Sequence, residues 1–127
     1  MERRQVAAVS PQAAIVGYSR AVRTGNLVYV AGTAPVMPDG AEPPPDAYGQ
    51  ARRCLEIVVA ALAELGALPE HVVRTRIFVT RPDIWEDVGR AHGEVFGEAR
   101  PATAMVVVAA LLDPRWLLEI EADAVVP

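Results

Sequence analysis

One segment near the end of the chain combines a strand pattern with side chains that carry acid–base chemistry. From Leu117 to Val125, apolar and acidic residues alternate, which predicts a strand with its acids on one face. Glu119 lies on that face and is a candidate general acid or base that positions water. The alternative is a structural ion pair with Arg74 or Arg76, which alternate on another predicted strand.

Other reactive side chains occur in patterns that do not indicate catalysis. Cys54 falls beside the apolar stripe of a predicted helix, which favours core packing over nucleophilic chemistry. His71 and His92 lack metal-ligand spacing to a cysteine, an aspartate or each other, so no metal site is expected. Ser10 and Ser19 are the only serines, and neither sits in a nucleophile elbow.

Composition restricts the chemistry further. The 127 residues provide one domain, 1–127, and 52% of them are apolar, which indicates a packed core. All 12 basic residues are arginine, so neither a lysine Schiff base nor a phosphate-loop lysine is available. The net charge of −4 and the scattered arginines argue against nucleic acid as a partner.

The same sequence features predict a cytoplasmic protein. No apolar run reaches the roughly 18 residues that cross a bilayer, and no apolar segment follows the charged N-terminus as in a signal peptide. The single cysteine excludes an intrachain disulfide framework.

The first half of the chain reads as a hairpin, a loop, a helix and a strand. Residues 16–22 and 27–31 predict two strands, and the five prolines of residues 35–45 predict a loop. A helix begins after Asp46 and ends at Gly66. The buried stripe of this helix is predicted to be Ala51, Leu55, Val58, Leu62 and Leu65. The strand at 72–80 is predicted to face inward with Val73, Thr75, Ile77 and Val79.

The second half adds a helix at 84–96 and strands at 103–111 and 117–125. We expect Trp85, Val88 and either Val95 or Phe96 to face inward from that helix. The resulting ββαβαββ order predicts an α+β fold, with two helices on one face of a sheet.

The predicted open face of this sheet mixes charge with large apolar groups. Phe78, Leu117 and Val125 share it with the charged residues, and residues 104–110 are apolar on both faces of their strand. This mixture predicts contact with further copies of the chain, and clefts where the open face meets a neighbour.

Several segments, in order and spacing, resemble one protein family over nearly the full length. The chain is similar to the Rid (reactive intermediate deaminase, YjgF-like) family. The segments are Gly17-Tyr18, Gly25 to Gly32, the helix Gln50 to Gly66, Phe78-Val79-Thr80, Arg100-Pro-Ala and Glu119-Ile-Glu-Ala. The resemblance implies a chorismate mutase-like fold, a homotrimer with three intersubunit clefts, and no cofactor.

The resemblance also implies roles for individual residues. Glu119 would position the attacking water, and Tyr18 and Gly32, with Thr33 beside it, would line the cleft. Thr103 occupies the position at which the deaminases carry an arginine for the substrate carboxylate, and Gly89 replaces a cleft asparagine. The chain therefore resembles a divergent member that lacks the deaminase arginine.

Each of these positions also has a structural interpretation. Arg100 is either a substitute carboxylate ligand or a surface arginine before a proline. Tyr18 is either a cleft residue or a half-buried strand tyrosine, Gly32 either a cleft amide or a turn residue. Thr103 either bonds a ligand or only starts a strand.

Two functions follow from the resemblance. The first is a cofactor-free hydrolase of the enamine/imine deaminase type with an altered substrate. The second is a trimer that binds a small metabolite without turnover. A ribonuclease activity, assigned to some members of the family, fits the acidic charge and the absence of lysine poorly.

Overall fold

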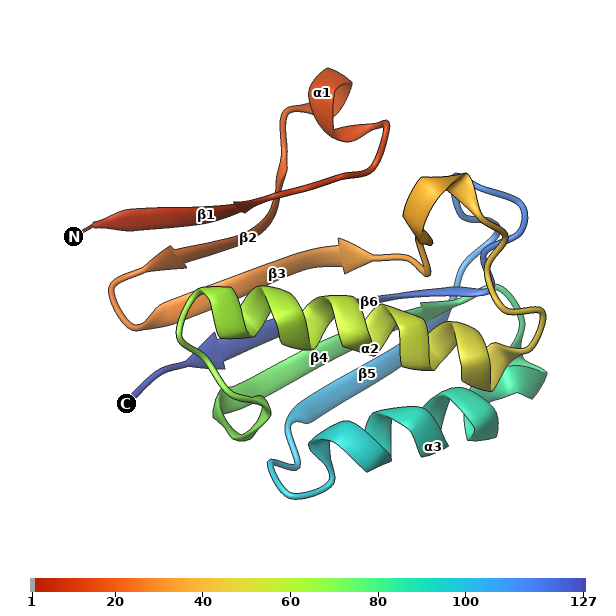
Figure 1. Cartoon of the computed structure of the whole chain (residues 1–127). Helices are drawn as coiled ribbons and strands as arrows, with labels where there is room; N and C mark the ends of the chain where they lie inside the picture. Colours follow the sequence, from red (N-terminus) through yellow and green to blue (C-terminus); the bar gives the residue numbers. More distant parts are fainter. Residues whose placement is uncertain (1) are drawn as a thin grey trace.

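The structure is a computed structural model that describes residues 2–127, and its strands form one mixed sheet in the order β1-β2-β3-β6-β4-β5 (Figure 1). All neighbouring strands pair antiparallel except β4 and β5, which are parallel. The strands are β1 (Arg3–Ala7), β2 (Ser19–Thr24), β3 (Leu27–Thr33), β4 (Val72–Val79), β5 (Ala102–Val107) and β6 (Leu118–Val125).

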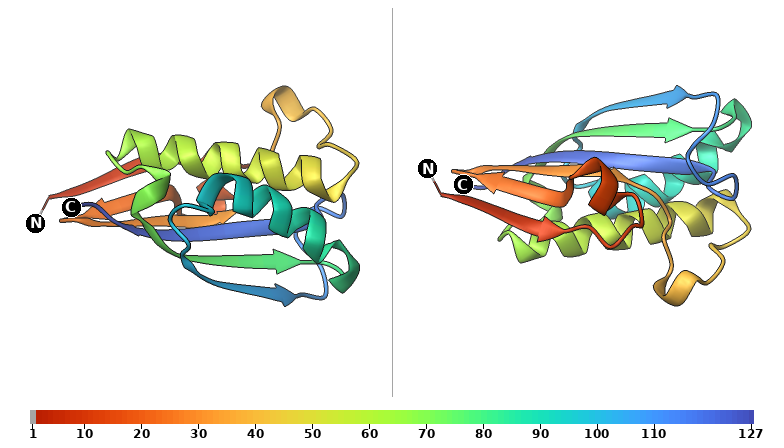
Figure 2. Two further views of the ribbon diagram at one scale, coloured as in Figure 1. Left: turned by 90° about the horizontal axis from the view of Figure 1, so that it is seen from below. Right: turned by 90° about the horizontal axis from the view of Figure 1, so that it is seen from above.

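Two long helices cover one face of this sheet and leave the other face bare (Figure 2). The α-helices are α1 (Ala13–Val16), α2 (Ala47–Glu64) and α3 (Trp85–Phe96), and short 3-10 turns occupy Pro38–Gly40, Pro69–His71 and Pro82–Ile84. The predicted α+β architecture, with both helices on one face, is confirmed. Within residues 2–127, every helix is too short or too polar to cross a bilayer.

Helix α2 forms where its sequence predicts and supplies much of the core. Asp46 caps it by accepting a hydrogen bond from the Gly49 backbone N–H at 2.9 Å. Gly66, with a φ of 80°, ends it in the left-handed conformation that glycine adopts without strain. All five residues of the predicted stripe are buried, with exposed fractions of 2% or less.

Strand β6 is the last in the sequence and lies between β3 and β4 in the sheet. Its even-numbered residues, from Leu118 to Ala124, are at most 2% exposed and pack beneath the helices. Its acidic residues lie on the bare face, as the alternation predicted. The strand that carries Glu119 is thus held on both sides and packed from one face.

Three strands carry one more residue than the neighbour with which they pair. In β2 the extra residue is Arg20, because Val6 pairs with Ala21 while Ala7 pairs with Ser19. In β3 it falls at Ala31–Gly32, because Val30 pairs with Ala122 and Thr33 with Ile120, which leaves two residues of β3 opposite one residue of β6. In β4 it is Val73. Such bulges reverse the side-chain alternation that follows them and re-aim single residues.

Two core predictions were wrong for local geometric reasons. Val73 was predicted to face inward but is 50% exposed, because it is the bulged residue and Val72 takes the buried place. Trp85 is 57% exposed, while the preceding Ile84 is buried at 4%. The turn that ends at Ile84 fills the inward position before α3 begins. Of the residues expected to face inward, Val88 and Phe96 are buried, and Ala91 is buried between them.

The N-terminal region also differs from the prediction. Residues 3–7 form an additional edge strand, β1, whose side chains are mostly exposed and therefore show no apolar alternation. Residues 13–16 are helical, and Gly17, with a φ of 84°, ends that turn. The predicted strand 16–22 accordingly begins only at Ser19, and the predicted strand 103–111 is shorter, as β5.

One buried amide ties the helix layer to the start of β6. Gln50 is 2% exposed. Its Nε2 donates to the Pro44 and Arg115 carbonyls at 2.9 and 3.0 Å, and its Oε1 accepts from the Leu117 backbone N–H at 2.8 Å. The side chain satisfies three backbone groups around the segment that leads to Glu119.

Replacing Gln50→Leu should destabilise the fold by about 2–3 kcal/mol, because buried backbone groups lose their partners while the volume is kept. Urea denaturation at fixed protein concentration measures this loss. Gln5→Leu, on the exposed edge strand β1, is the matched control and should change stability by less than about 0.5 kcal/mol. Equal stability of the Gln50 variant and the unaltered chain would contradict the structural role.

Candidate active site

Glu119 lies half-buried on the bare face of β6, beside the bulge of β3. Its Oε1 would be 3.1 Å from a Cβ placed on Gly32, so a larger residue at position 32 would push the carboxylate away by a few tenths of an ångström. Burial raises the pKa of the Glu119 carboxyl, Arg20 acts against that rise, and Glu121 adds to it. The carboxyl is therefore a stronger base than an exposed glutamate.

The structural alternative for Glu119 was an ion pair with Arg74 or Arg76. Arg76 instead pairs with Glu121 at 3.3 Å and with Asp123 at 3.5 Å. Among residues 2–127, no cation lies within 4.0 Å of the Glu119 carboxylate. The acids of the bare face thus divide into paired ones and Glu119, which retains its acceptor capacity.

A buried arginine adjoins this carboxyl group. Arg20 is 8% exposed, and its Nη2 donates to the Gly32 carbonyl oxygen at 2.8 Å. Its guanidinium lies 5.7 Å from the centre of the Tyr18 ring. Burial lowers the pKa of Arg20, while Tyr18 and Glu119 act in the opposite direction. Tyr18, Arg20, Gly32 and Glu119 therefore form one cluster, called here the Glu119 cluster.

Tyr18 and Thr33 have different places around this cluster. Tyr18 is half-buried, and its hydroxyl contacts the Ser10 hydroxyl through a hydrogen bond. Thr33, predicted to line the cleft, has no exposed surface, and its hydroxyl donates to the Ala31 carbonyl at 2.7 Å. The β3 bulge turns the Thr33 side chain into the core, so this side chain does not face the Glu119 cluster.

Thr103 belongs to a separate group of residues on β4, β5 and α3. Its hydroxyl is 2.7 Å from the Thr75 hydroxyl, which is 2.8 Å from His92 Nε2. Burial lowers the pKa of His92 and so favours its neutral form. The resulting chain of hydrogen bonds, called here the Thr103 chain, runs from an exposed edge strand into the core beneath α3.

Gly89 and Arg100 lie in the same region as the Thr103 chain. Gly89 is one turn before His92 on α3, and the space beside its Cα is open. Arg100 is exposed in the turn before β5, with a φ of 49° and its backbone N–H bonded to Phe96 O at 2.8 Å. Neither residue touches the Glu119 cluster.

One copy of the chain does not join these two groups. Thr103 pairs with Thr75, whose side chain is buried under the helices, whereas Glu119 pairs with Phe78 on the opposite, bare face. β4 separates their strands in the sheet. The candidate residues therefore form two separate groups, the Glu119 cluster and the Thr103 chain.

Sequence reasoning missed Arg20 as a member of the site. Strict alternation with buried Ala21 would place Arg20 on the exposed side, yet both residues are buried. The bulge at Arg20 explains this exception. The available signal was the adjacency Tyr18-Ser19-Arg20, a charged residue beside a predicted cleft tyrosine at the start of a strand.

Cys54 lies where its structural interpretation predicted. Cys54 is fully buried in α2, and burial raises the pKa of its thiol, which keeps it protonated. Within residues 2–127, no group of three or more His, Cys, Asp and Glu side chains is placed to hold a metal ion.

With this geometry in place, comparison with known proteins identifies the class. Residues 8–126 match the family model described as Endoribonuclease L-PSP. A crystal structure from Mycobacterium tuberculosis, described as a member of the highly conserved YjgF/YER057c/UK114 family, superposes with a TM-score of 0.89. It is 46% identical, and the match covers 98% of this chain and 100% of that one.

Two curated relatives support the same assignment. A RutC family protein of Haemophilus influenzae is 39% identical, with 89% of each chain covered. The 2-iminobutanoate/2-iminopropanoate deaminase of Escherichia coli is 34% identical, with 94% of this chain and 95% of the relative covered. The chain belongs to the YjgF/RutC family, also called the Rid family, and has its chorismate mutase-like α+β fold.

The raised pKa of Glu119 predicts a pH-dependent cost of keeping this side chain. A raised pKa in the folded state favours folding below about pH 4.5, and this contribution is lost as pH rises through the folded-state pKa. Glu119→Gln should therefore gain stability relative to the unaltered chain between pH 4 and pH 8, with a higher Tm at pH 8.

Thermal denaturation at the two pH values tests this expectation. Glu98→Gln, an exposed carboxyl after α3, is the control and should shift Tm equally at both. A Glu119→Gln variant whose difference from the unaltered chain does not change with pH would show that burial of Glu119 carries no such cost.

Proposed function

We propose that this protein is a cofactor-free hydrolase of small imine- or enamine-like metabolites, in which Glu119 activates water. The observation that carries the proposal is the half-buried Glu119 carboxyl with its raised pKa, unpaired among residues 2–127 and beside Gly32. A base whose pKa is nearer to neutral accepts a proton from water more effectively. Membership of a family that includes a 2-iminobutanoate/2-iminopropanoate deaminase supports this reaction class.

The proposed reaction needs one carboxylate and one water. Glu119 accepts a proton as the water oxygen bonds to the imine carbon, while the imine nitrogen takes up a proton from solvent. The carbinolamine then collapses to a ketone: the proton held by Glu119 passes to the departing ammonia, and the hydroxyl proton returns to solvent. An imine and one water thus give one carbonyl compound and one ammonia, with no redox change.

We propose that the complete cleft forms between copies of the chain in a homotrimer. A head-to-tail interface joins unlike surfaces and closes into a ring, so it would bring the Glu119 cluster of one copy to the Thr103 chain of the next. Exposed apolar side chains near both edges of the sheet support such contacts: Val9, Ile15 and Val16 beside β1 and α1, and Val106, Val107 and Leu112 on and after β5.

Thr103 makes the substrate of this proposed cleft different from that of an arginine-bearing relative. A threonine hydroxyl supplies no charge for a carboxylate, and this one is already engaged with Thr75. We infer an imine whose anchoring does not depend on a cation at position 103. The buried single cysteine is compatible with the reducing cytoplasm, where we expect the protein to act.

The threonine at position 103 also favours a second function, a trimer that binds a small metabolite without turnover. In that case Glu119 and Tyr18 contribute ligand contacts, and the lost arginine accounts for the loss of catalysis. The description of the family model as an endoribonuclease would suggest cleavage of RNA. This function is less well supported, because the chain carries a net charge of −4 and no lysine.

An enamine hydrolysis assay separates catalysis from binding alone. With 2-aminoacrylate generated in place by a serine dehydratase, the protein should speed release of pyruvate and ammonia above the rate in buffer. Glu119→Gln should lower the added rate by roughly a hundredfold, because the water loses its base. If the protein gives no acceleration, the binding function is favoured. Full activity of the Glu119→Gln variant would show that Glu119 takes no part in the reaction. A monomeric mass by light scattering would contradict the cleft shared between copies.

Thr103→Arg tests whether the rest of the cleft is competent for a carboxylate substrate. A guanidinium at this exposed position should lower KM for 2-aminoacrylate by roughly tenfold or more, through a charge-assisted contact. Thr103→Met has similar length without the charge and should give no gain. Equal KM values for the Arg and Met variants would place position 103 outside the substrate's reach.

A further inference from the structure

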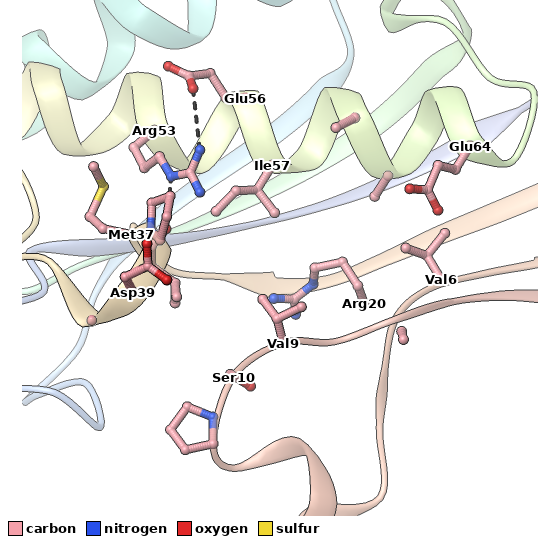
Figure 3. Close-up of a pocket in the computed structure, with 17 residues that line it drawn as sticks. Val6, Val9, Ser10, Arg20, Met37, Asp39, Arg53, Glu56, Ile57 and Glu64 are labelled. Atoms are coloured by element: carbon pink, nitrogen blue, oxygen red, sulfur yellow. Dashed lines mark hydrogen bonds and ion pairs between the residues drawn. The ribbon is translucent and has the colours of Figure 1, made fainter.

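A pocket separate from Glu119 lies between α2, the segment that follows β1 and the loop after β3 (Figure 3). Its volume is about 680 Å³, within the range of small-molecule sites. Neither Glu119 nor Thr103 lines it. The pocket is therefore separate from the Thr103 chain, and it shares only Arg20 with the Glu119 cluster.

The walls of this pocket are mainly apolar, and most of its charges are at the rim. Asp39, Glu56 and Glu64 are exposed. Arg53 already donates to the Val36 carbonyl at 2.8 Å and pairs with Glu56 at 3.4 Å. The apolar walls come from Val6, Val9, Val36, Met37, Ile57 and Ala61.

Arg20 is the one buried charge that lines the pocket. Its side chain extends into the space beneath α2 (Figure 3). Within residues 2–127 its Nε–H has no hydrogen-bond partner, and no carboxylate lies within 4.0 Å. The Gly32 carbonyl and the Tyr18 ring are its polar contacts. A buried guanidinium that lacks both a counter-ion and one hydrogen-bond partner favours the binding of an anion.

We propose that this pocket binds a small monocarboxylate with an apolar body, its carboxylate on Arg20 and its body along Ile57 and Ala61. The apolar walls favour a hydrocarbon body, and the unpaired guanidinium favours a negative head group. The acidic rim disfavours a dianion such as a phosphate ester, because Asp39, Glu56 and Glu64 would repel its second charge.

Hexanoate is a suitable probe, and hexanamide is its uncharged counterpart of the same shape. In a ¹H–¹⁵N NMR titration, hexanoate should shift the amides of Val9, Ile57 and Ala61, and of Gly32 through the Arg20 hydrogen bond. The affinity for hexanamide should be lower by roughly tenfold or more. Equal affinities, or shifts confined to other residues, would overturn the proposal.

Replacing Arg20 tests the contribution of the charge. Arg20→Met should reduce hexanoate affinity by roughly tenfold or more, to the level of hexanamide. Arg52→Met, an arginine of α2 outside the pocket, should leave it unchanged. Hexanoate affinity retained by Arg20→Met would contradict the assignment of the head group.

Arg20 is buried, so its replacement also changes the packing of the fold. A substitution at Ala60 tests the pocket without replacing a buried side chain. Ala60 is exposed on α2 and lines the pocket, so Ala60→Trp fills the space without altering the core. Hexanoate binding should be lost in this variant and kept in Ala63→Trp, on an exposed position of α2 outside the pocket. Binding that survives Ala60→Trp would rule out this pocket as the site.

Discussion

The hydrogen bond from Arg20 to the Gly32 carbonyl joins the two irregular points of the N-terminal half of the sheet. Each point is a strand bulge, one in β2 and one in β3, and a bulge leaves backbone groups without ladder partners. The guanidinium satisfies one of these groups and fixes the separation of the two strands there. Gly32 is thereby held against Glu119, and Arg20 is held between the sheet and α2.

The regular parts of this fold could be predicted because their periodicity is unbroken. The stripe of α2 and the alternation of β6 both led to the correct buried faces, and the Asp46 cap and Gly66 stop bounded the helix correctly. Alternation counts residues, however, and a bulge adds one that the count does not detect. This is why Val73 was assigned to the wrong face. The bulge of β3 likewise turns Thr33 into the core, although the family resemblance implied a place at the cleft.

The candidate site shows the same limit more strongly than the fold. Glu119, Tyr18 and Gly32 were identified from the sequence, and they do gather in the structure. Arg20 was missed because its position depends on a bulge whose pairing partner, β1, has no apolar pattern. The separation of the candidate residues into the Glu119 cluster and the Thr103 chain was also inaccessible from strand faces alone, since it depends on the order of β6, β4 and β5 in the sheet.

The central position of β6 has a consequence for how the chain reaches this state. Residues 118–125 leave the ribosome after the other five strands of the sheet, yet both β3 and β4 depend on them for hydrogen-bond partners. Until β6 has been made, these two strands present open edges of the kind that pair with other chains. The sheet therefore closes only once β6 is available, through contacts between distant parts of the sequence, which is the slow kind of folding step. Loss of residues 118–125 would divide the sheet in two rather than shorten it at an edge.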